Sequence, residues 1–260
     1  MTDMSATTNP TAARAAKTET PADWLRTIII AVLIAMSFRG LLLDPFNIPS
    51  GSMKPGLQVG DFLFVSKYSY GYSSLVLGFG LLPFKGRIGG HAPERGDVVV
   101  FKLPTDDSFF KESYIKRMVG LPGDVVEVKS GVIIINGKEM PRERIGPVMV
   151  EERDGPLRPA TLYRETFSPG RSHEILQEYD NGILDNYGPV TVPPDHYFCM
   201  GDNRNNSSDS RTMKVGFVPA ENLVGRARFT FLSLTEDASF WQFWKWPFAI
   251  RWGRMFKTIE

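Results

Sequence analysis

A serine lies in a short turn rich in glycine and proline, directly after an apolar N-terminal segment. The turn reads Pro49-Ser50-Gly51-Ser52-Met53-Lys54-Pro55. Gly51 lets the backbone approach a ligand closely, and the two prolines stiffen the entry and exit of the turn. A serine presented in this way can act as a nucleophile if a base takes its proton. Ser52 is therefore a candidate nucleophile, although a turn serine that bonds only its own backbone is the commoner arrangement.

The partner base is better sought among the lysines than among the histidines. His91 lies in a Gly/Pro loop, His173 in a charged segment and His196 behind two prolines. Lys116 instead lies in the apolar, strand-like run 114–119. Burial in such a run disfavours the ammonium form and can lower the lysine pKa enough for the amine to accept a proton near neutral pH. Strand lysines more often point to solvent, so this role requires that Lys116 be buried.

A third segment, the dense polar loop 201–211, completes a pattern. It reads Gly201-Asp202-Asn203-Arg204-Asn205-Asn206-Ser207-Ser208-Asp209-Ser210-Arg211. In this order, the three segments resemble the conserved boxes of the bacterial type I signal peptidases (leader peptidases), and the resemblance runs from the apolar segment to about residue 227. It implies a membrane-bound serine endopeptidase that removes N-terminal signal peptides from exported preproteins. Such enzymes cut after small residues at the first and third positions before the cut (Ala-x-Ala type).

The resemblance also implies roles for individual residues. Ser52 would be the nucleophile and Lys116 the general base. Ser207 is expected to orient the Lys116 amine, and Ser50 to donate its hydroxyl to the oxyanion alongside the Ser52 backbone N–H. Structural support near the site is expected from three charged residues: Asp209, Arg211 and Arg117.

Departures from the family pattern are confined to details of the loops. Asn205 stands where Asp is more frequent, and Lys54 and Gly56 stand where Met and Thr are frequent. None of these changes removes a catalytic group. No metal and no cofactor are expected, because the polar loop lacks the central Gly and closing Glu of a calcium loop and His173-Glu174 lacks the second histidine of a zinc peptidase.

Composition excludes some classes of protein. The 260 residues carry a net charge of +1 with scattered lysines and arginines, which gives no case for nucleic acid as a partner. Preproteins and membrane lipid are the expected partners instead. Cys199 is the single cysteine, so an internal disulfide is excluded. Between Phe198 and Met200, Cys199 is more typical of a buried apolar side chain than of a thiol nucleophile.

The N-terminal region predicts a flexible tail over residues 1–22 and a transmembrane anchor over 23–43. The apolar segment has the length of a membrane helix, with Trp24 at one interface, although Arg39 must then snorkel or face protein. A cleaved signal peptide is the alternative, but residues 37–39 do not form a small-x-small cleavage site. Basic residues before the segment favour a cytoplasmic N-terminus. The expected location is thus the bacterial inner membrane, single-pass, with the catalytic domain on the periplasmic side.

The remainder of the chain predicts a mainly β fold. Strands are expected at 62–68, 98–101, 114–119, 125–129 and 132–135, and the last is followed by the Asn136-Gly137 hairpin signal. The expected catalytic β-domain comprises residues 44–137 and 188–235. An inserted second region is expected at 138–187, where charge, Pro and Gly rise and alternation fades.

Two further stretches are unusual for a soluble core. Residues 70–90 are apolar but rich in glycine, and the tail 236–260 mixes aromatic residues with basic ones. Such mixtures suit a bilayer interface, and the alternative for the tail is a core position beneath the sheet.

Two other functions remain open from the sequence. A self-cleaving repressor protease shares the Ser/Lys chemistry, but it would need a DNA-binding domain. A membrane-tethered β-domain that binds exported proteins without cutting them would be distinguished by its failure to cleave a preprotein.

Overall fold

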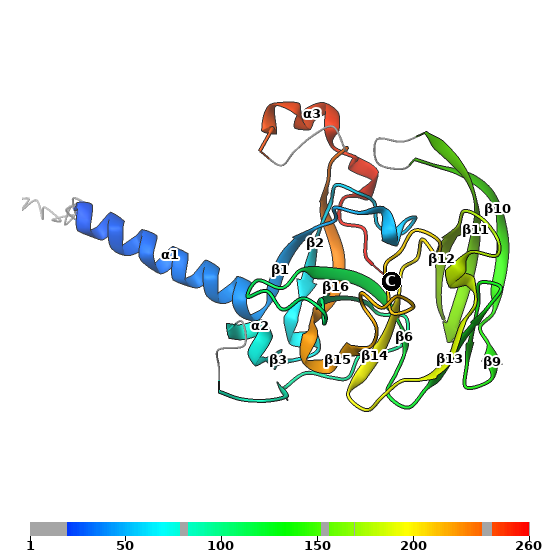
Figure 1. Cartoon of the computed structure of the whole chain (residues 1–260). Helices are drawn as coiled ribbons and strands as arrows, with labels where there is room; N and C mark the ends of the chain where they lie inside the picture. The colour runs from blue at the N-terminus through cyan, green and yellow to red at the C-terminus, as the bar shows by residue number, and fades with distance from the viewer. Residues whose placement is uncertain (1–19, 79–82, 152–155, 169, 236–240, 260) are drawn as a thin grey trace, which may run out of the picture. The chain divides into compact units, whose positions relative to one another are not determined.

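The computed structural model describes residues 20–78, 83–151, 156–168, 170–235 and 241–259 (Figure 1). The chain divides into two compact units, Met1–Phe38 and Arg39–Glu260. Nearly all of the predicted flexible tail, and parts of the 70–90 loop and of the C-terminal tail, lie outside the described residues.

A single long helix occupies the position predicted for the membrane anchor. Helix α1 (Pro21–Leu41) begins at a reciprocal cap, in which Thr20 N–H donates to Asp23 Oδ2 at 3.0 Å and Asp23 N–H donates to Thr20 Oγ1 at 3.3 Å. Its apolar side chains are exposed, for example Trp24 at 59% and Ile34 at 66%. In the part of the chain that is described, no helix has the length and apolarity that a membrane crossing requires. The predicted helix is confirmed, and the predicted membrane span is not.

The second unit is rich in strands, so the predicted mainly β class is confirmed. Its strands are β1 (Leu43–Asn47), β2 (Asp61–Ser66), β3 (Tyr72–Ser73), β4 (Arg87–Ile88), β5 (Val98–Lys102), β6 (Ser113–Gly120), β7 (Val125–Lys129), β8 (Val132–Ile135), β9 (Lys138–Glu139), β10 (Arg142–Glu151), β11 (Leu157–Ser168), β12 (Arg171–Gln177), β13 (Tyr187–Thr191), β14 (His196–Met200), β15 (Val218–Pro219) and β16 (Leu223–Ser233). The short helices are η1 (Gly51–Met53), η2 (Lys67–Ser69), α2 (Ser74–Gly78), η3 (Ile183–Asp185), η4 (Ala220–Asn222), η5 (Phe243–Lys245), α3 (Trp246–Ala249) and η6 (Trp252–Arg254).

A seven-stranded sheet carries the candidate site. Its order is β1-β2-β16-β5-β6-β14-β15, and every neighbouring pair is antiparallel. Strand β6 lies between β5 and β14, with Val99 opposite Lys116. The turn that contains Ser52 connects β1 to β2. The fold therefore brings a turn early in the chain and an interior strand of the sheet to the same place.

The region predicted as an insertion contains a sheet of its own. Strands β10, β11 and β12 pair antiparallel in that order and lie side by side in Figure 1. The fading alternation there did not indicate strands of this length. Strands β10 and β11 pair along most of their lengths, and much of β10 is exposed, so β10 does not need a regular buried face.

Five aromatic side chains of the C-terminal tail are exposed rather than part of the core. Trp241, Phe243, Trp244, Phe248 and Trp252 are between 62% and 94% exposed. The tail is fastened by its arginines instead. Arg251 Nη1 donates to Gln58 Oε1 at 2.7 Å, and Arg254 Nε donates to Asp61 Oδ1 at 3.1 Å. Of the two alternatives for the tail, the core position is wrong for these five aromatic residues.

Candidate active site

Core packing fixes the turn that presents Ser52. Ser52 lies in η1, and the next side chain, Met53, is 1% exposed and packs with Ile48 and Leu57 against the sheet. Burying a methionine side chain stabilises a fold by about 1.5–3 kcal/mol. Met53 thus holds the turn in place, and Ser52 lies at the wall of a cavity with 8% of its surface exposed.

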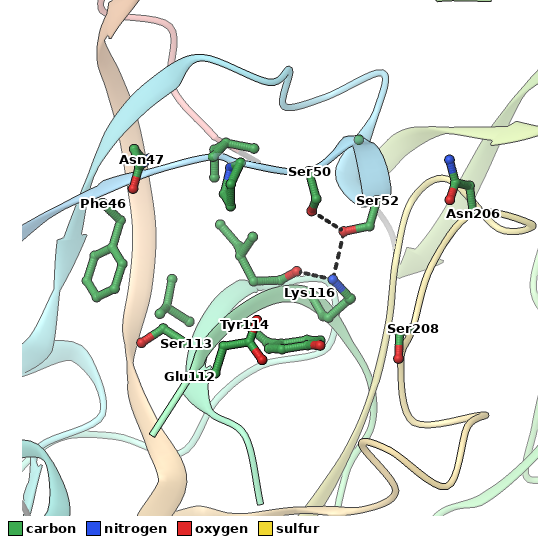
Figure 2. Close-up of a pocket in the computed structure, with 15 residues that line it drawn as sticks. Phe46, Asn47, Ser50, Ser52, Glu112, Ser113, Tyr114, Lys116, Asn206 and Ser208 are labelled. Atoms are coloured by element: carbon green, nitrogen blue, oxygen red, sulfur yellow. Dashed lines mark hydrogen bonds between the residues drawn. The ribbon is translucent and has the colours of Figure 1, made fainter. Parts of the chain in front are cut away.

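Lys116 reaches from β6 to the same point, as Figure 2 shows. Its Nζ donates hydrogen bonds to Ser52 Oγ at 2.8 Å and to the Ile115 carbonyl at 2.8 Å. The lysine is only 3% exposed, and the ring centroid of Tyr114 lies 5.3 Å from Nζ. The solvent-facing alternative for Lys116 is therefore wrong, and the structure joins the two residues that the sequence singled out.

Burial changes the acid–base behaviour of Lys116. Desolvation lowers the pKa of its amine from the ordinary value of 10.5 to about 8. Asp209 and Asp202 act in the opposite direction, because a nearby carboxylate favours the ammonium form. Burial outweighs both carboxylates. A lysine with this pKa is neutral in roughly one molecule in ten at pH 7 and more at higher pH.

Ser50 places a second hydroxyl beside the first. Its Oγ lies 3.3 Å from Ser52 Oγ (Figure 2). Both side chains line a cavity of about 290 Å³ that is bounded by the β1–η1 connection on one side and by β6 on the other. None of the residues lining this cavity is a histidine. The groups in contact with Ser52 Oγ that can exchange a proton are a buried amine and a hydroxyl.

The polar loop 201–211 packs directly against the nucleophile turn. Asn203 N–H donates to the Ser52 carbonyl at 3.0 Å. A Cβ on Gly201 would lie 2.6 Å from that carbonyl oxygen and 2.2 Å from Ser207 Oγ, so only glycine allows this approach. Ser207 is 7% exposed, and its Oγ makes no hydrogen bond in the structure. The hydrogen bond expected between Ser207 and the Lys116 amine is therefore not formed.

The charged residues near the site form two separate pairs. Arg211 binds Asp209 through Nε and Nη2 at 2.9 and 2.8 Å. Arg117 binds Asp202 through the same two nitrogens, each at 2.8 Å, and donates to the Gly96 carbonyl. The sequence reasoning grouped Arg117 with Asp209 and Arg211 and missed Asp202, although Asp202 lay in the motif.

A buried charge cluster continues from the loop into the inserted sheet. Arg204, 2% exposed, makes a two-pronged ion pair with Glu165 of β11. Burial raises the pKa of Glu165, but Arg204 and His173 together outweigh burial and lower this pKa to about 2. His173 of β12 lies 3.3 Å from Glu165 Oε2 and stacks on Phe167. None of these contacts was expected from the sequence.

Comparison with known proteins decides the family. The family model described as "Signal peptidase, peptidase S26" matches residues 21–232. The chain belongs to the signal peptidase family, peptidase S26. The resemblance of the three segments is thereby confirmed, and the chain is an enzyme, a serine peptidase of the signal peptidase I type.

Two sequence relatives agree with this assignment. Signal peptidase I of Rickettsia typhi is 37% identical over 247 residues, which is 88% of this chain and 90% of the relative. Signal peptidase I of Rickettsia massiliae is 41% identical over 213 residues, which is 79% and 77% of the two chains. A crystal structure of a signal peptidase I from Enterococcus faecalis matches 52% of this chain and 97% of that one, with 26% identity and a TM-score of 0.31.

Cys199 has no place in this chemistry. The thiol is free and fully buried, and burial raises its pKa. A buried neutral thiol is a poor nucleophile. The expectation of a buried apolar side chain is confirmed.

Proposed function

We propose that the chain cleaves exported preproteins at the membrane with Ser52 as the nucleophile and Lys116 as the general base. The observation that carries this proposal is the buried 2.8 Å contact between Lys116 Nζ and Ser52 Oγ. The lowered pKa of Lys116 supports it, because a base must be neutral to take a proton.

In the first step, the Ser52 Oγ–H proton passes to the neutral Lys116 amine while Oγ bonds to the carbonyl carbon of the scissile peptide. The carbonyl oxygen becomes an oxyanion. Ser50 Oγ–H and the Ser52 backbone N–H donate to it, and their place in one turn beside Oγ supports that role.

Next, the carbon–nitrogen bond breaks and the leaving amine takes the proton from the Lys116 ammonium. This step releases the mature chain and leaves the signal peptide as an ester on Ser52. Water then gives a proton to Lys116 and attacks the ester. Collapse of that second intermediate returns the proton to Ser52 Oγ and frees the signal peptide with a new carboxylate.

Ser207 has a supporting role in this scheme. Its buried hydroxyl makes no hydrogen bond in the structure and lies against Gly201, beside the Ser52 carbonyl. In this proposal the hydroxyl accepts a hydrogen bond from the amine as that group gains charge. Asp209, Arg211 and Arg117 hold the loop and β6 in register through their ion pairs.

Selection of small residues before the cut is what the family resemblance implies, and the catalytic cavity supplies a wall for them. Phe46, Ile48 and Ile115 supply apolar wall, and the remaining space is about 290 Å³. A substrate lying extended between residues 46–49 and β6 would add as a strand and direct alternate side chains, those of the first and third residues before the cut, to the same wall.

Membrane attachment is part of the proposal. The apolar side chains of α1 are exposed along the helix, and the tail presents exposed aromatic residues. These surfaces support a single-pass protein of the bacterial inner membrane with its catalytic unit on the periplasmic side, the arrangement that the basic residues before α1 also favour.

The test uses the purified full chain in detergent and a preprotein with alanine at the first and third positions before the cut. We expect a single cleavage after the first of these residues. Preproteins with phenylalanine at either position are expected to resist cleavage, because the family resemblance implies small residues there. A preprotein that binds but is never cut would favour the non-cutting binding domain instead.

A further inference from the structure

A second cavity begins where the catalytic cavity ends. It measures about 200 Å³ and shares Pro49, Ser50, Gly51 and Asn206 with the catalytic cavity. Ser52 lies at the wall of the first cavity, one residue from this shared boundary. A polypeptide that crosses Ser52 in an extended conformation therefore has a cavity on each side of the scissile bond.

The inserted sheet supplies the far wall of the second cavity. Val150 and Glu151 at the end of β10 line it, and so does Arg158 near the start of β11. Lys54, from the nucleophile turn, donates a hydrogen bond from Nζ to the Glu151 carbonyl at 2.5 Å. This contact joins the turn to the inserted sheet across the cavity.

Glu178 is joined to the nucleophile turn through one side chain, that of Asn203. Asn203 Nδ2 donates to Glu178 Oε1 at 3.4 Å and to the Gly51 carbonyl at 3.5 Å. The Asn203 side chain is fixed, since the residue is 1% exposed and its backbone N–H is bonded to the Ser52 carbonyl. Half-buried Glu178 thus lines the second cavity close to the reacting serine.

We propose that this second cavity binds the first residues of the mature chain, those just after the cut, and that Glu178 sets the charge preferred there. The inference rests on the proposed cleavage by Ser52. With the signal peptide in the catalytic cavity, the mature side must continue through adjoining space, and the cavity under the inserted sheet is that space. The inserted sheet thereby acquires a role as a wall of the substrate groove.

The charged residues of the second cavity determine which substrate side chains it prefers. A carboxylate only accepts hydrogen bonds, so Glu178 attracts a basic side chain and, after cleavage, the new α-ammonium group. Lys54 and Arg158 lie on the cavity wall as well, beside Glu151. Reversing the charge of Glu178 would make four charged wall residues predominantly cationic and shift the preference toward acidic residues.

The test uses the full chain in detergent and three peptides that share the same signal-peptide sequence before the cut. One ends in a small fluorogenic amine directly after the cut, and the others continue for four residues with Lys or Glu at the second. We expect Glu178→Lys to lower the Lys-over-Glu ratio of kcat/KM about tenfold. Glu174→Lys, an exposed change on β12 outside the cavity, is the matched control and should leave that ratio unchanged.

The fluorogenic-amine peptide separates damage to the catalytic turn from loss of mature-side binding. If Glu178→Lys no longer cleaves it, Glu178→Gln replaces it, with an expected change in the ratio of about threefold. An unchanged ratio in the folded Glu178 variants, or an equal change in Glu174→Lys, would overturn the inference. If the wild type cleaved none of the three peptides, the proposed function itself would fail.

Discussion

The neutral form of Lys116 is accessible because of where its side chain ends. Nζ lies against Ser52 and a backbone carbonyl with almost no solvent contact, and this burial outweighs two carboxylates that favour the charged form. The apolar run around Lys116 was sufficient to predict such an environment. Sequence could not give the 2.8 Å contact, because it depends on how β6 and the nucleophile turn pack.

Removal of either catalytic group should abolish cleavage without unfolding the protein. Ser52→Ala leaves no cavity in the turn, and Lys116→Met keeps most of the bulk of the lysine stem. We expect each to lower kcat at least about a thousandfold, and the double variant to be no worse than either. Lys129→Met, an exposed lysine on β7, is the control and should stay active. Substantial activity in Lys116→Met would show that the base is misassigned.

The partners of the buried ion pairs could not be predicted from the sequence. The loop 201–211 offers two aspartates and two arginines within eleven residues, and Arg117 lies far away in the chain. Which carboxylate meets which guanidinium depends on the register of β6 against β14, where Arg117 stands opposite Met200. The resulting Arg117–Asp202 pair joins the residue next to the proposed base to the polar loop.

At the scale of elements, the strands of the large sheet were predictable and those of the insertion were not. Strands β5, β6, β7 and β8 match their predicted ranges to within a residue or two, since apolar residues recur in them. Strands β10 and β11 are ten and twelve residues long, contain Pro147 and Pro159, and pair with each other from Arg142 opposite Glu165 to Glu151 opposite Leu157. Their sequences lack the alternation that a core-facing strand would show.

Strand β11 should depend on its buried ion pair. Glu165→Gln leaves Arg204 buried without a charged partner, and we expect the free energy of unfolding to fall by about 3–5 kcal/mol. Chemical denaturation of the detergent-solubilised chain measures this loss. Glu143→Gln, whose carboxylate lies 3.7 Å from Arg164 and is largely exposed, is the matched control with an expected loss below about 0.5 kcal/mol.

The sign of the pH effect follows from the lowered pKa of Glu165. Its stabilising contribution is fully present above the ordinary value of 4.5 and is lost as pH falls toward the folded value of about 2. The wild type should therefore lose stability between these values, and Glu165→Gln should lose less over the same range. Equal acid sensitivity of the two proteins would show that the pair contributes little.

At the scale of the whole molecule, we expect the apolar surface outside α1 to contact lipid. The tail presents Trp244, Phe248 and Trp252, each more than 60% exposed, among Lys245 and other basic residues. The sequence shows that the tail combines aromatic and basic residues, but it does not show whether the aromatic side chains are buried. Exposed aromatic residues beside cations are typical of a bilayer interface.

Without residues 1–43, the chain should still bind lipid vesicles through this surface. Replacing Trp244, Phe248 and Trp252 with serine should abolish flotation with vesicles that contain anionic lipid. The matched control replaces Ile183 and Met213, which are 96% and 98% exposed but lie outside the tail. A truncated chain that stays wholly in the aqueous fraction, or a control that also loses binding, would contradict the lipid assignment.

The pH dependence of kcat/KM tests the Ser52–Lys116 mechanism most directly. Only the neutral amine can take the serine proton, so kcat/KM should rise with pH through an ionisation near the lowered pKa of Lys116, about 8. A histidine base would place that rise at about 6.5, and burial lowers the pKa of His173 further. A profile that rises near pH 8, and keeps this rise when His91 and His196 are replaced, is the predicted result. A rise at or below about pH 6.5, or one that disappears with the histidines, would contradict it.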